Sequence, residues 1–81
     1  MPTVLVTQGF YVRIRTNDHE PAHVHVSKVG GEARIALGLN GGTPRLLTVS
    51  KEMNSRDAAT ALRLVIEHNE ELLTQWREVH E

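Results

Sequence analysis

Three of the five histidines lie within one short segment, Asn17–Val26. If the second half of this segment forms a β-strand, His23 and His25 point to the same face, because side chains on a strand repeat every two residues. His19 belongs to the preceding loop, which can bring it beside them. Histidine changes charge near neutral pH and is a common metal ligand, so the segment predicts proton transfer or metal binding.

Arginines of neighbouring segments are predicted to share this face. Apolar residues alternate with other residues over 10–15 and 33–37, which is typical of half-buried strands. If the apolar residues face a common core, the opposite side of the sheet collects the remaining side chains. This surface, here called the outer sheet face, comprises Tyr11, Arg13, Arg15, His23, His25 and Arg34. Cross-strand neighbours lie about 4.5–5.5 Å apart, so these residues are expected to form one continuous patch.

One interpretation of the patch is a transition-metal site. Two histidines separated by one residue on a strand, together with a loop histidine, can provide three of the four positions of a tetrahedral zinc site. The ligands would be His19, His23 and His25, with Asp18 as a fourth ligand or as the acceptor that orients one of them. The segment matches no established zinc motif.

A second interpretation is a site for a phosphate-bearing ligand such as RNA. The arginines of the outer sheet face can hold phosphate groups, and Tyr11 can stack on a base. Metal-independent RNA cleavage would use His23 or His25 as the acid or base, with an arginine stabilising the charge on the transition-state phosphate. His19 and Asp18 would shape the adjacent loop.

A third interpretation gives the histidines a structural role. Asn17 and Asp18 favour a turn, Pro21 restricts the backbone, and the imidazoles would hydrogen-bond loop carbonyl groups. The outer sheet face would then be solvated or would dock a protein partner. All three interpretations remain open at the level of the sequence.

The elements that would position these residues are short strands followed by a helix. Period-two alternation covers about residues 3–49, with turn signals at Gln8-Gly9, Gly30-Gly31 and Asn40–Pro44. Sequential short turns favour an antiparallel meander of four or five short strands. Gly30-Gly31 is expected to be a two-residue hairpin turn.

The hydrophobic period becomes helical after Ser50. Apolar residues then form one stripe, which comprises Ala58, Ala61, Leu62, Val65, Leu72, Leu73 and Trp76. Because residues 51–81 contain no glycine or proline, the pattern predicts one long helix over about residues 52–79, with Ser55 as its N-cap. Asn69 interrupts the stripe, and its amide is expected to hydrogen-bond a strand edge or a loop backbone.

The expected architecture is an α+β fold in which the long C-terminal helix covers one face of the meander. A chain of 81 residues builds one modest core, so residues 1–81 are expected to form a single domain.

The absence of cysteine excludes disulfides and thiolate metal sites and favours a cytoplasmic location. No apolar segment reaches membrane-spanning length, so no membrane association is expected. Open edge strands make a homodimer an option.

Charge is unevenly distributed along the chain. The net charge is −1 with neutral histidines, but residues 1–50 are mildly basic and residues 51–81 are acidic. This balance argues against a DNA-binding domain with a strong basic footprint. It leaves room for a small site for an anionic ligand on the first part of the chain.

Motifs along nearly the whole chain resemble a known bacterial family. They are the start Met1–Leu5, the turn Gly9–Tyr11, the histidine segment Asn17–Val26, the stretch Gly31–Arg34 and the helical stretch Glu67–Trp76. The most specific one is Asp-His-x-Pro-x-His-Val-His at residues 18–25. Together they resemble the small family catalogued as domain of unknown function four-one-six-zero. Ala22 departs from the pattern, since many relatives have a second proline at this position, and this should loosen the loop slightly.

The resemblance implies a small cytoplasmic protein encoded in a toxin–antitoxin-like gene pair. Members of the family are commonly found beside a second small protein, so a dedicated protein partner is expected. The resemblance assigns no catalytic residue, and it does not indicate which member of a pair is toxic.

Overall fold

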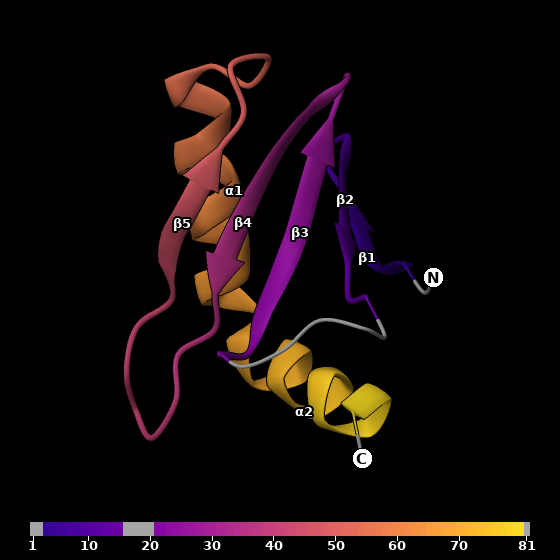
Figure 1. Cartoon of the computed structure of the whole chain (residues 1–81), viewed down its shortest axis with the longest axis vertical. Helices are drawn as coiled ribbons and strands as arrows, with labels where there is room; N and C mark the ends of the chain where they lie inside the picture. The colour runs from indigo at the N-terminus through magenta and orange to yellow at the C-terminus, as the bar shows by residue number, and fades with distance from the viewer. Residues whose placement is uncertain (1–2, 16–20, 81) are drawn as a thin grey trace.

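The computed structural model describes residues 3–15 and 21–80, which form a five-stranded antiparallel sheet and two helices (Figure 1). The strands are β1 (Thr3–Thr7), β2 (Phe10–Arg13), β3 (His23–Lys28), β4 (Gly31–Ala36) and β5 (Arg45–Val49), and they lie in this order across the sheet. The helices are α1 (Ser55–Glu67) and α2 (Asn69–His80). The predicted α+β meander with C-terminal helical cover is confirmed.

The turn between β3 and β4 requires a left-handed backbone. Val29 and Gly30 form it with φ values of 47° and 82°. Positive φ at both central positions is typical of a type I′ turn, which matches the twist of the flanking strands. The turn lies one residue before the expected Gly30-Gly31 pair. Gly31 begins β4, where an added Cβ would lie 2.8 Å from the Cβ of Met53, so its small size serves packing.

The inner face of the sheet packs against both helices. The alternating apolar side chains of the strand region are buried as expected: Phe10, Val12, Ile14, Val24, Val26, Ala33, Ile35 and Leu37. The helices contribute Ala58, Ala61, Leu64, Val65, Leu72, Leu73 and Trp76 to the same core. In Figure 1, α1 runs behind β4 and β5, and α2 lies below the sheet. The predicted stripe is confirmed except that Leu64 is buried and Leu62 is only partly buried.

The single long helix predicted from the sequence is wrong, because the helical region divides at His68. The backbone N–H of His68 donates to the carbonyl groups of Leu64 and Val65, at 3.1 and 3.2 Å, and α2 begins at the next residue.

The Asn69 side chain forms two hydrogen bonds with the backbone of Gly38, one as acceptor and one as donor. Its Oδ1 accepts from the Gly38 N–H at 2.8 Å, and its Nδ2 donates to the Gly38 carbonyl at 3.0 Å. The predicted role of Asn69 is therefore confirmed, and its partner is the loop after β4.

Asn54, rather than the expected Ser55, is the N-cap of α1. Its backbone is extended, with φ −75° and ψ 167°, and its Oδ1 accepts from the Asp57 N–H at 2.7 Å. Ser55 is the first helical residue. Asp57 lies in the first turn, where a carboxylate favours the positive end of the helix dipole. No helix in the described part of the chain has the length and apolar character needed to cross a membrane.

Both edge strands contain an irregularity. In the pairing of β1 with β2, the register shifts between Thr3 and Leu5, so β1 contains one extra residue. In the pairing of β4 with β5, the register shifts between Arg34 and Ile35, so β5 contains one extra residue. Bulges at sheet edges bend the strand and discourage pairing with another chain. The edges of the sheet are therefore poorly suited to pairing with a strand of another chain.

Candidate functional site

The cross-strand register places a histidine between two arginines on the outer sheet face. His25 on β3 pairs with Arg13 on β2 and with Arg34 on β4, and Arg34 pairs in turn with Thr48 on β5. Paired residues point to the same side of a sheet. Four neighbouring strands therefore contribute to one row of side chains, here called the central row: Arg13, His25, Arg34 and Thr48.

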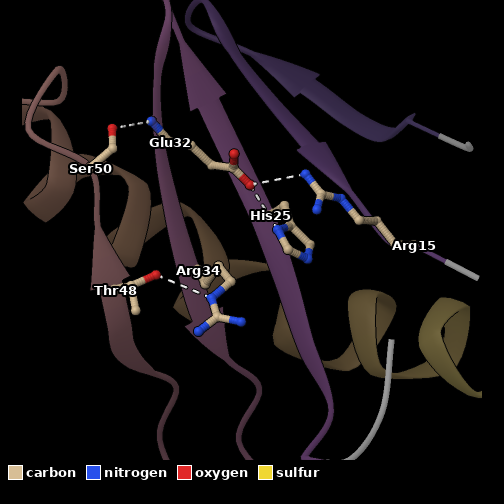
Figure 2. Close-up of polar contacts among 6 residues, drawn as sticks. All are labelled: Arg15, His25, Glu32, Arg34, Thr48 and Ser50. Atoms are coloured by element: carbon tan, nitrogen blue, oxygen red, sulfur yellow. Dashed lines mark hydrogen bonds and ion pairs between the residues drawn. The ribbon is translucent and has the colours of Figure 1, made fainter. Parts of the chain in front are cut away.

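His25 is only 5% exposed although it lies on the outer sheet face. Its Nδ1 is 2.7 Å from Oε2 of Glu32, and Nη2 of Arg15 is 3.3 Å from the same oxygen (Figure 2). Because a carboxylate oxygen only accepts, His25 donates from Nδ1, and the basic lone pair of the neutral ring is on Nε2. Glu32 thus joins the predicted site residues His25 and Arg15 into one hydrogen-bonded network.

Glu32 is the main site residue that the sequence interpretation missed. It is two positions before Arg34 on the same strand, so the alternation that selected Arg34 also selects Glu32. Ser50 holds its backbone: the Glu32 N–H donates to Ser50 Oγ at 3.0 Å, and the Ser50 N–H donates to the Glu32 carbonyl at 2.8 Å. The backbone that carries this carboxylate is consequently fixed beside the central row.

A cavity of about 360 Å³ opens on this part of the sheet. It is lined by Arg15, His25, Glu32, Arg34, Thr48, Val49 and Ser50. Within it, Nε of Arg34 donates to Oγ1 of Thr48 at 3.1 Å, which orients the guanidinium (Figure 2). This outer-face cavity therefore presents two guanidinium groups, one carboxylate and hydroxyl groups.

His23 lies beside His25 but has a different partner. It is 7% exposed, and its Nδ1 donates to the carbonyl of Pro21 at 2.8 Å, the kind of bond that the structural interpretation expects. The two imidazole rings meet edge to face, with centroids 5.2 Å apart. A metal held by these rings would have to bind through Nε2, since each Nδ1 is engaged.

The remaining predicted metal ligands, His19 and Asp18, lie outside the described residues. Within residues 3–15 and 21–80, no group of three or more histidine, aspartate or glutamate side chains is placed to hold a metal ion.

The β1–β2 end of the outer sheet face is aromatic and apolar. Tyr11 is 45% exposed, and the guanidinium carbon of Arg13 lies 5.8 Å from the centre of its ring, within reach of a cation–π contact. Val6 pairs with Tyr11 and is 58% exposed. This end of the face can accept a flat, apolar group.

Positive charge gathers on the outer sheet face, and α2 carries a net negative charge. Arg45 pairs with Ala36, which pairs in turn with His23, and it adds an exposed cation that the sequence interpretation did not assign to the site.

A second cavity of about 310 Å³ lies between the Gly41–Pro44 loop and the α1–α2 junction. Its lining includes Glu67, Glu70 and Glu71, so it does not suit an anion.

Comparison with known proteins places the chain in a family without assigning an activity. No curated protein and no solved structure matches it. The model of one family, described as "Domain of unknown function (DUF4160)", matches residues 9–77, which include every described strand and helix except β1 and the end of α2. The sequence motifs and this match agree, and the chain belongs to the DUF4160 family.

Proposed function

We propose that this chain binds RNA through its outer sheet face, as one component of a toxin–antitoxin-like pair in the bacterial cytoplasm. The observation that carries the proposal is the central row, in which Arg13 and Arg34 flank His25 across three adjacent strands. The lack of cysteine supports the cytoplasmic assignment.

The spacing and chemistry of the face suit a single-stranded polynucleotide. Arg13 and Arg34 lie two strand spacings apart, about 10 Å, so they can engage different phosphates of one strand. Each guanidinium can hold a phosphate through two hydrogen bonds. Tyr11, beside Arg13, offers a ring on which a base can stack, as in other sheet surfaces that bind RNA.

The geometry favours binding over cleavage. In phosphoryl transfer the attacking and leaving oxygens lie on opposite sides of phosphorus, so an acid and a base must approach from both sides. The rings of His23 and His25 touch at a centroid distance of 5.2 Å, which leaves no room for a phosphate between them. We therefore propose RNA binding as the activity and treat cleavage as an outcome to be tested.

The proposal is tested by measuring fluorescence anisotropy of a short labelled single-stranded RNA at several salt concentrations. Arg13→Gln and Arg34→Gln should each weaken binding and make the slope of log affinity against log salt shallower by about one. Arg63→Gln is the matched control, because Arg63 is exposed on α1, which packs against the inner face. Equal affinity of all four proteins, or no binding by the wild type, would overturn the proposal.

Expression in a bacterial host separates binding from cleavage. The wild type and the double variant His23→Ala/His25→Ala are compared for growth arrest and for the integrity of cellular RNA. Intact RNA with both proteins is the expected result. RNA fragments that depend on the two histidines would replace binding by ribonuclease activity.

A small protein partner is the second candidate for the same face. The exposed Val6 and Tyr11 beside Arg13 favour it, because apolar and aromatic groups next to arginine are typical of protein interfaces. Co-purification of the neighbouring gene product with the wild type, lost in Tyr11→Ser and Arg13→Gln and unaffected by added RNA, would assign the face to that partner.

A further inference from the structure

A carboxylate occupies the middle of the cationic outer sheet face. Glu32 lies between Arg15 and His25 and lines the outer-face cavity. A site that only holds phosphate gains nothing from a negative charge, because like charges repel. The position of Glu32 therefore requires an explanation beyond phosphate binding.

One oxygen of this carboxylate has no hydrogen-bond partner among the described residues. Both described hydrogen bonds, from Arg15 and from His25, go to Oε2. In Figure 2 the other oxygen of Glu32 points away from these two side chains. The Glu32 side chain is 40% exposed, and a carboxylate has about four acceptor positions, so Oε1 can accept hydrogen bonds from a bound molecule.

Donor groups line the same cavity as this carboxylate. The guanidinium groups of Arg15 and Arg34 and the hydroxyl groups of Thr48 and Ser50 line the same cavity. The complementary ligand must therefore present N–H donors next to an acceptor. The cavity of about 360 Å³ is at the small end of the range of about 300–1,000 Å³ found for small-molecule sites.

Among the RNA bases, guanine has this pattern. Its Watson–Crick edge carries two adjacent donors, N1–H and the 2-amino group, followed by the O6 acceptor. Adenine and cytosine place a ring-nitrogen acceptor beside their amino group, and this lone pair would face the carboxylate. Uracil offers a single N–H between two carbonyl groups. A carboxylate beside guanidinium groups thus selects guanine by hydrogen bonding along its edge.

We infer that the outer-face cavity binds a guanine base of RNA, with Glu32 as the residue that determines specificity. Oε1 of Glu32 accepts from N1–H and the 2-amino group, and Arg15 or Arg34 donates to O6 or to the adjacent phosphate. This inference rests on the proposed RNA binding and names the base that the site prefers.

The test compares three labelled octaribonucleotides that differ at one central position. One is all uridine, one has a single guanosine, and one has inosine, which keeps N1–H and O6 but lacks the 2-amino group. The wild type should bind the guanosine strand at least about fivefold more tightly than the all-uridine strand, with inosine between them. Glu32→Gln, which keeps the side-chain size, should abolish the preference and still bind the all-uridine strand. Glu70→Gln, at an exposed position on α2, is the control and should keep it.

The outcomes separate the inference from the proposed function. Equal wild-type binding of all three strands overturns guanine recognition and leaves RNA binding in place. If the Glu32→Gln variant keeps the preference for the guanosine strand, the assigned role of Glu32 is overturned. No binding of any strand by the wild type overturns both proposals. The wild-type series needs no variant, so the inference stays testable even if Glu32→Gln is less stable.

Discussion

The carboxylate of Glu32 lies 2.7 Å from Nδ1 of His25, although the two residues are not cross-strand partners. His25 pairs with Arg34 and Glu32 pairs with Ser27, so the contact runs diagonally across β3 and β4. Diagonal neighbours are far enough apart that only long side chains can bridge them. The glutamate on β4 reaches across to a nearly buried ring on β3, and Arg15 donates to the same oxygen.

We expect Glu32→Ala to lower the free energy of unfolding by about 1–2 kcal/mol. The substitution removes the acceptor of the nearly buried His25 ring, and the partial exposure of the carboxylate limits the loss. Urea denaturation followed by circular dichroism measures it. Glu78→Ala, at an exposed position of α2, should change stability by less than about 0.5 kcal/mol. Equal effects of the two substitutions would mean that the His25–Glu32 contact contributes nothing to folding.

The side of the sheet on which each residue lies could be predicted, because strand periodicity depends only on the local sequence. Val24 and Val26 are in the core and His25 is on the opposite side, as the alternation indicates. The same rule would have identified Glu32. Its bond to His25 could not be predicted, because it depends on the register between β3 and β4, which single-strand alternation does not determine.

The division of the helical region could not be predicted from local signals. No glycine or proline marks His68, and the hydrophobic stripe continues past it. A tertiary contact accompanies the division: Asn69 forms two hydrogen bonds with Gly38, a residue far from it in the sequence. The sequence indicated that Asn69 needs a partner, but the position of that partner depends on the folded chain.

Asn69→Ala is expected to destabilise the protein by about 2–4 kcal/mol. It removes two hydrogen bonds to the buried backbone of Gly38, and each polar group left without a partner costs about 1–3 kcal/mol. Hydrogen exchange measured by NMR should show faster exchange of the Gly38 amide. Gln75→Ala, at an exposed position of α2, is the control. An unchanged Gly38 exchange rate in Asn69→Ala would show that this contact does not hold the loop.

Substitutions at the start of α1 distinguish the observed N-cap from the predicted one. Asn54→Ala should cost about 1 kcal/mol, because the Asp57 N–H loses its acceptor at the helix end. Ser55→Ala should be nearly neutral or slightly stabilising, since Ser55 is the first helical residue and alanine favours helix. Thermal unfolding of both variants measures the difference. The reverse order of stabilities would restore Ser55 as the N-cap.

Trp76 ties α2 to the core and carries a buried N–H that donates to no described residue. It is 6% exposed, it stacks on His80 with centroids 3.9 Å apart, and its Nε1 has no acceptor among the described residues. Trp76→Ala should therefore cost about 3–5 kcal/mol, because it leaves a large cavity. Trp76→Phe keeps an aromatic ring and removes the buried N–H, so we expect it to cost less than about 1.5 kcal/mol. Urea denaturation of the two variants tests this order, and a phenylalanine variant as unstable as the alanine variant would show that the indole N–H has a partner in solution.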